Sequence, residues 1–183
     1  MRVLPIGLTI ATLAFGISAA QAATSCAAAG FVTGAGNAID RAARSQSPAA
    51  FSAATARFTD LHAISLFALG SYRKQLPKSR EAEFMALTRS YVGRFMADHA
   101  NSIHATGLRI TDCKPQAANL VVSAKLGGGG KIIFKLVRTP SGYRIADLNL
   151  RSTWLAQQLR SHFTAVIRRG DGNIEALFRY LNA

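Results

Sequence analysis

The sequence predicts an α+β fold in which a curved antiparallel sheet of about four strands is covered by helices. Three observations lead to this fold class. Apolar residues recur three and four apart over 27–101, alternate with polar ones over 104–150, and return to the helical spacing over 153–181. Short turns separate the alternating stretches, which indicates a meander of neighbouring strands. Helices, then strands, then closing helices are typical of a sheet with helices on one face.

The first two predicted helices span 27–43 and 49–59. The first has its apolar residues on one side, although three glycines reduce its helix propensity. Ser47 is a good N-cap for the second helix, and Pro48 fits its first position, where no backbone N–H is needed. The apolar stripe of the second helix consists of Phe51, Ala54 and Phe58.

A third helix is predicted over 61–72 and a fourth over 80–100. The third is apolar nearly all round, so we expect it to be buried on every side. Pro77 interrupts the pattern between the two helices. The stripe of the fourth helix consists of Phe84, Leu87, Tyr91 and Phe95.

The predicted strands are 104–113, 119–126, 131–138 and 143–150. Ile132, Phe134 and Leu136 share one face of the third strand, which should be the inward face. Two helices, 153–169 and 174–181, end the chain. The first of them carries its own apolar stripe, and we expect that stripe to face the sheet.

Residues 1–22 have the pattern of a secretory signal peptide. Arg2 supplies the positive charge, residues 3–17 are nearly all apolar, and Ala20-Gln21-Ala22 fits the small-x-small cleavage rule. We therefore expect an exported protein in which 23–183 form one domain, large enough for a hydrophobic core. A retained N-terminal anchor is the alternative.

The net charge of +13 favours contact with anionic surfaces such as nucleic acid, membrane or lipid headgroups. Export makes nucleic acid a poor choice, so an anionic membrane surface is the expected partner. A basic surface that only aids solubility is an equal alternative. Two cysteines, Cys26 and Cys113, suggest a disulfide in an oxidising compartment, with two free thiols as the other possibility.

Chemistry-bearing residues are sparse, and the sequence predicts no metal site, no cofactor and no enzyme. His99 and His104 lack the spacing and the further ligands that zinc requires. Asp60 and His62 could form an acid–base pair in a small secreted enzyme on a cone-shaped fold. They lie two apart on different helix faces, and no nucleophile motif accompanies them.

Four short motifs follow one another along the chain. They are Asp60 with Leu69-Gly70-Ser71-Tyr72; Arg80-Glu81 with Phe84, Leu87 and Tyr91; Tyr143-Arg144-Ile145-Ala146-Asp147; and Ile167-Arg168-Arg169-Gly170-x-Gly172. Together they resemble the MlaC-type phospholipid-binding proteins, also called the toluene-tolerance family. These are the periplasmic auxiliary components of a lipid-transporting ABC system. The last turn departs from the common Gly-Gly pattern of the family.

The resemblance implies an NTF2-like cone with an apolar lipid pocket between sheet and helices. The expected lining comes from the inward faces of the predicted elements: Ile64, Phe67, Ala68, Phe84, Tyr91, Phe95, Val122, Phe134, Leu136, Trp154, Phe163 and Ile167. Phe134 and Phe163 are expected to face each other across it. A filled core is the alternative for these residues, because spacing does not distinguish a core from a pocket.

The resemblance also implies a function. A monomer in the periplasm would carry a glycerophospholipid between an outer-membrane lipoprotein complex and an inner-membrane ABC transporter complex. A carrier of hopanoid-associated lipid from a sister branch of the family is one alternative. A partner-binding module without any ligand is another.

Overall fold

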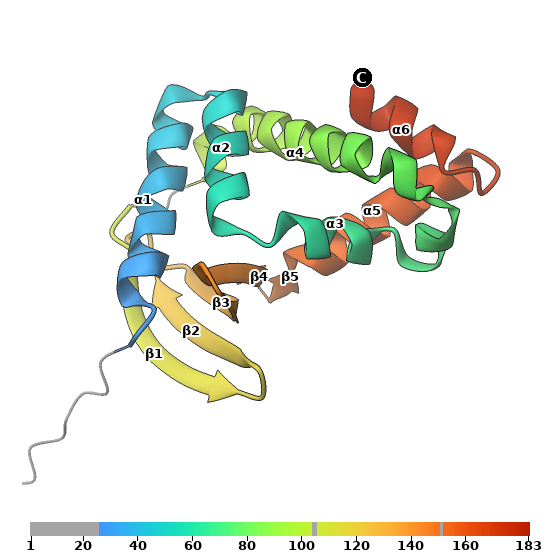
Figure 1. Ribbon diagram of the computed structural model, residues 1–183. Coiled ribbons are helices and arrows are strands. Elements are labelled where there is room, and N and C mark those ends of the chain that lie inside the picture. Colours follow the sequence, from blue (N-terminus) through green and yellow to red (C-terminus); the bar gives the residue numbers. More distant parts are fainter. Residues whose placement is uncertain (1–25, 104–105, 151) are drawn as a thin grey trace, which may run out of the picture.

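The computed structural model describes residues 26–103, 106–150 and 152–183, so the expected signal peptide 1–22 lies outside the described residues. The fold is α+β, as predicted. An antiparallel sheet forms one part of the fold and the helices form the other, and the first helix packs on the sheet with its first half and on the second helix with its second half (Figure 1). Among the described residues, no helix combines the length and apolar character needed to cross a bilayer.

The sheet is antiparallel throughout, with its strands in sequence order. Its strands are β1 (Arg109–Gln116), β2 (Asn119–Lys125), β3 (Lys131–Thr139), β4 (Gly142–Leu150) and β5 (Thr153–Trp154). The predicted start of the first strand at 104 is wrong. A turn at Gly107, whose φ is +70°, precedes β1. β5 adds a fifth strand of two residues, too short to leave a periodic signal.

The first two helices follow the predicted pattern closely. They are α1 (Ala29–Ser45) and α2 (Pro48–Phe58). The Ser47 side chain accepts a hydrogen bond from the Ala50 N–H at 3.2 Å, which caps α2. α4 (Glu81–Asp98) packs along α2, where Gly93 lets the two backbones approach closely.

The prediction of a long, fully buried third helix is wrong. α3 (Leu61–Ala68) stops before Gly70, which has φ +58°, and a 3₁₀ segment, η1 (Gly70–Gln75), continues the chain. His62 is exposed, and Phe67 is 39% exposed. Gly70 adopts the left-handed conformation that ends the helix. One side of the apolar segment before it faces water.

Two short 3₁₀ segments, η2 (Lys78–Arg80) and η3 (Ala100–Ser102), flank α4. The chain ends with α5 (Leu155–Arg169) and α6 (Glu175–Asn182). The turn between α5 and α6 requires glycine twice. A Cβ on Gly170 would collide with the Cβ of Ala176, and Gly172 has φ +75°.

The buried apolar residues form three clusters instead of one continuous core. The sheet cluster joins α1 to the sheet through Val32, Val122, Phe134, Leu136 and Ile145, among others. The bundle cluster joins α3, α4, α5 and α6 through Leu69, Phe84, Phe163, Ile167 and Leu177, among others. A small third cluster around Phe51 joins α1, α2 and the segment after α4.

A disulfide joins Cys26, just before α1, to Cys113 in β1, with their Cα atoms 5.6 Å apart. It ties the start of the described chain to the edge of the sheet. Since α1 packs on the same sheet, the bridge fixes the helix end whose side chains cover the sheet cluster.

Candidate functional site

A cleft of about 600 Å³ lies where the sheet meets the helices. Its walls come from α2, the start of α3, α4 and the turn between β3 and β4. The lining residues are Ala56, Thr59, Asp60, Leu61, His62, Ala82, Met85, Ala86, Arg89, Thr139, Ser141 and Arg144. A cleft of this size is in the range of ordinary small-molecule sites.

The lining divides into an apolar and a charged part. Leu61, Met85 and several alanines supply the apolar part. Arg89 on α4 and Arg144 on β4 supply two guanidinium groups, one from each layer of the fold. An apolar cleft with a few charged groups suits an amphipathic ligand with an anionic end.

Asp60 and His62 both lie in this cleft, but each is already engaged. The Asp60 carboxylate accepts the Ala63 N–H at 3.1 Å and so caps α3, while its backbone N–H donates to the Ile145 carbonyl at 2.9 Å. His62 Nε2 is 2.6 Å from Glu81 Oε1. In the described part of the chain, no hydroxyl or thiol is hydrogen-bonded to either side chain, so no nucleophile–base pair is formed there.

A second groove of about 340 Å³ runs between α1 and α2. Alanines form most of its lining, and Arg41 and Arg57 lie at it. The Arg57 guanidinium lies 5.2 Å from the centroid of the Phe58 ring, which also lines this groove. The lining of this groove comes from α1 and α2, and it shares no residue with the lining of the first cleft.

The twelve residues expected to line a pocket fall into three groups. Ala68, Phe84, Phe163 and Ile167 are buried in the bundle cluster, with Tyr91 packed against it. Val122, Phe134 and Leu136 are buried in the sheet cluster. Phe67 and Phe95 are exposed, at 39% and 50%, while Ile64 and Trp154 are half-buried.

The expected meeting of Phe134 with Phe163 does not occur, because the two rings belong to different clusters. α1 covers the inward face of the sheet at Phe134, and Phe163 packs edge-on against Phe84, with ring centroids 6.3 Å apart. The described lining of the cleft includes none of the twelve residues. The sequence did not predict Arg89 and Arg144 as lining residues, since single arginines outside an apolar stripe leave no periodic signal.

An aromatic and histidine group lies on the bundle surface beside Phe163. The His162 Nε2 is 2.9 Å from the Tyr180 hydroxyl, and the Tyr91 hydroxyl is 3.4 Å from the same oxygen. Burial, followed by the hydrogen bond with Tyr180, raises the pKa of Tyr91. Burial, followed by the charge of Arg169, lowers the pKa of His162.

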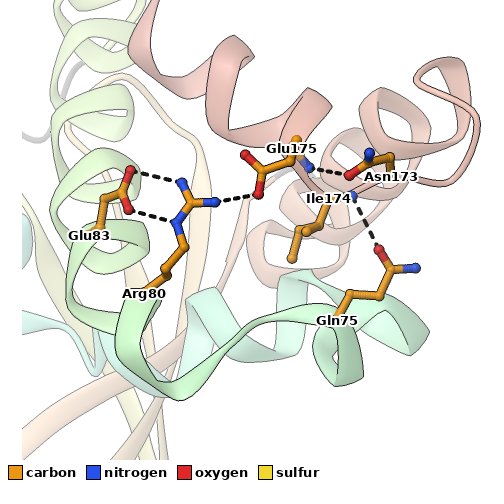
Figure 2. A network of polar contacts seen from close by, with 6 residues as sticks. All are labelled: Gln75, Arg80, Glu83, Asn173, Ile174 and Glu175. Atoms are coloured by element: carbon orange, nitrogen blue, oxygen red, sulfur yellow. Dashed lines mark hydrogen bonds and ion pairs between the residues drawn. The ribbon is translucent and has the colours of Figure 1, made fainter.

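Arg80, a residue of the resemblance motifs, connects two helices of the bundle. Arg80 forms ion pairs with Glu83 and Glu175 (Figure 2). Its guanidinium group also lies 3.8 Å from the centroid of the Phe178 ring. The hydrogen bonds from Arg80 lower the pKa of Glu83. The network fastens α6 to the start of α4.

Gln75 adds a second fastening between the same parts of the chain. Its side chain accepts the Ile174 N–H at 3.2 Å (Figure 2). It also donates to the Gly172 carbonyl at 3.0 Å. The turn between α5 and α6 is thereby tied to η1. These contacts give Arg80 and Gln75 a structural role, distinct from the cleft.

A protein-family model and a solved structure both match this chain. The model of the MlaC protein family matches residues 34–183. A phospholipid-binding protein from Ralstonia solanacearum, solved in complex with a phospholipid, has a similar fold at TM-score 0.69 and 15% identity. The alignment covers 84% of this chain and 93% of that one. No curated protein matches. The family match spans most of the chain, and the chain therefore belongs to the MlaC protein family.

Proposed function

We propose that this chain is a phospholipid-binding shuttle that works in the periplasm without catalysing a reaction. One observation carries the proposal: the cleft lies where the sheet meets the helices, and one of its lining residues, Met85, packs against the bundle cluster. An apolar ligand that entered there would meet the bundle cluster first and would reach the sheet cluster if the two clusters parted. The fold shared with a phospholipid complex supports this reading.

Acyl chains need a site that shields them from water in a water-filled compartment. Each exposed CH₂ costs about 0.8 kcal/mol, so two chains of roughly sixteen carbons represent on the order of 25 kcal/mol of driving force for burial. That figure exceeds what non-covalent binding delivers, and so it bounds the driving force only. A carrier must hide the tails, whereas the headgroup can stay in water.

We infer that the tails enter by parting the two clusters. Val122, Phe134 and Leu136 would then line the pocket from the sheet, and Ala68, Phe84, Phe163 and Ile167 from the bundle. Parting two clusters exposes apolar surface, which the acyl chains cover again. A single interdigitated core would have to lose its packing first, at a cost of several kcal/mol.

The proposed partners are an inner-membrane ABC transporter complex and an outer-membrane lipoprotein complex. Family membership motivates this proposal, and the basic end of α5 offers a docking surface. Arg168 and Arg169 are exposed in the last turn of α5, where cations also interact favourably with the helix dipole.

Native mass spectrometry of the gently purified mature protein tests the lipid-binding proposal. We expect a bound phospholipid, and we expect lipid-stripped protein to take up phospholipid from vesicles. Absence of both would contradict the proposal. Delivery is tested separately with Arg168→Glu combined with Arg169→Glu. This variant should keep its lipid and deliver it more slowly to anionic vesicles, and equal rates at low salt would remove the docking role.

A further inference from the structure

We propose that Arg89 and Arg144 form a site for the phosphate group of the lipid at the mouth of the cleft. The proposal rests on the proposed function and specifies which chemical group the cleft recognises. Both arginines line the cleft, one from the helical layer and one from the sheet. An anion held by both would bridge the two layers.

The two arginines are available for a ligand. Within residues 26–103, 106–150 and 152–183, neither forms an ion pair with a carboxylate, in contrast to Arg44 and Arg80. Arg144 donates one N–H to the Tyr143 carbonyl at 3.0 Å, which leaves its other donors free to turn toward a ligand. Guanidinium groups match phosphate oxygens with paired hydrogen bonds.

Hydroxyl groups lie in the same cleft. Ser141 and Thr139 sit at the turn between β3 and β4, with their oxygens 3.1 Å apart. Thr139 donates to the Gly142 carbonyl at 2.8 Å, so Ser141 is the donor in the contact between the two hydroxyls, and it would exchange that hydrogen bond for one to a ligand. Two cations and a hydroxyl donor are a chemically suitable set for one phosphodiester.

The charges that face the site favour an anion. Among the described lining residues Asp60 is the one acid, and it is engaged as the cap of α3. His62 is paired with Glu81, so that carboxylate also has a partner. Asp60 keeps its negative charge and forms no ion pair among the described residues, so Arg89 and Arg144 leave this part of the lining with a net positive charge.

The rest of the lining distinguishes a lipid phosphate from free phosphate. Leu61, Met85, Ala82 and Ala86 lie in the same cleft and offer nothing to a bare phosphate ion. They suit the glycerol backbone and the first methylenes of an acyl chain, which would follow the phosphate toward the two clusters. We therefore assign the site to a phosphodiester that carries apolar chains.

Calorimetric titration of lipid-stripped protein tests this site with soluble short-chain probes. The probes are dihexanoylphosphatidylglycerol, dihexanoylglycerol with the same chains but no phosphate, and inorganic phosphate. Arg89→Gln combined with Arg144→Gln should weaken binding of the phospholipid roughly tenfold or more, about 1.4 kcal/mol per tenfold. Binding of dihexanoylglycerol should not change. Arg41→Gln combined with Arg57→Gln at the other groove is the matched control, and it should leave both affinities as in wild type.

The outcomes separate the site from the function. Equal phospholipid affinity in wild type and the Arg89/Arg144 variant overturns the site, and the proposed function stands. Inorganic phosphate binding as tightly as the phospholipid overturns the assignment to a lipid phosphate. A wild type that binds neither short-chain lipid counts against the proposed function and the site together.

Wild-type protein alone gives a second measurement that does not depend on how the variants fold. Raising salt from about 50 mM to about 500 mM should weaken binding of the phospholipid and leave dihexanoylglycerol unaffected, because exposed charges are screened. The same salt dependence for both lipids would contradict the site.

Discussion

At the scale of single residues, two acids of the resemblance motifs accept backbone N–H groups at the starts of helices. Asp60 accepts the Ala63 N–H at the start of α3, and Asp147 accepts the Ala156 N–H at 3.0 Å at the start of α5. A carboxylate in this position satisfies a free backbone donor and interacts favourably with the helix dipole. The two acids therefore have a structural role in the fold, and a carrier without catalytic activity can contain them for that reason.

His162 is a residue whose protonation should matter for stability. Burial, followed by Arg169, lowers the pKa of His162 below its ordinary value of about 6.5. The unfolded chain then binds a proton at this residue at pH values where the folded protein does not. Its contribution to the free energy of unfolding is therefore full above about pH 6.5 and is lost as the pH falls through the folded pKa.

Chemical denaturation at pH values on both sides of 6.5, about 7.5 and about 5.5, checks this expectation. Wild type should lose more stability toward acid than His162→Gln, whose amide keeps a hydrogen-bonding group beside Tyr180. Parallel stability curves for the two proteins would show that His162 does not contribute.

At the scale of elements, the sequence predicts what local chemistry specifies. Ser47-Pro48 starts α2 where expected, and alternation identifies β2, β3 and β4 to within a residue or two. The errors have local causes. Gly70 ends α3 inside an apolar run, and β5 consists of two residues held only by pairing with the end of β4.

Gly93 gives a test at this scale, because it lies where α4 meets α2. A Cβ there would collide with Ser52 Oγ and lie 2.5 Å from the Pro48 carbonyl oxygen. Gly93→Ala should lower the free energy of unfolding by about 1–3 kcal/mol, because backbone atoms cannot move aside cheaply.

Gly30 is the matched control, since it is also helical and nothing lies within 4 Å of its added Cβ. Gly30→Ala should stabilise by up to about 1 kcal/mol through helix propensity. Urea denaturation of both variants measures the difference. Equal effects would contradict the close approach of α2 and α4.

At the scale of the whole molecule, the sequence does not predict which apolar faces meet. Periodicity correctly identifies Phe134 and Phe163 as inward-facing, and both are buried. It contains no information on their partners. Small residues such as Ala28 and Ala35 let the chain at α1 pack closely on the sheet. The side chains of this segment cover Phe134, so the bundle does not contact it. The cleft lies where the helices meet the sheet, and its lining comes from several separate segments instead of one motif.

The disulfide between Cys26 and Cys113 acts on the whole molecule. It closes a loop with a sequence separation of 87 residues. In the chain-entropy model a loop of this length stabilises the fold by about 4–5 kcal/mol. Cys26→Ser combined with Cys113→Ser should lower the free energy of unfolding by an amount of that order in urea denaturation. A loss below about 1 kcal/mol would show that the unfolded chain gains little freedom without the bridge.

The central claim is that acyl chains enter between the sheet cluster and the bundle cluster through the cleft. A phospholipid with a photoactivatable diazirine at the end of one acyl chain, loaded from vesicles, tests it most directly. After irradiation, peptide mass spectrometry locates the modified residues. We expect modification on both sides of the boundary, at Phe134 or Leu136 in β3 and at Phe84 or Phe163 in the bundle. Modification confined to the groove between α1 and α2, or to the outer surface of the sheet, would contradict the account.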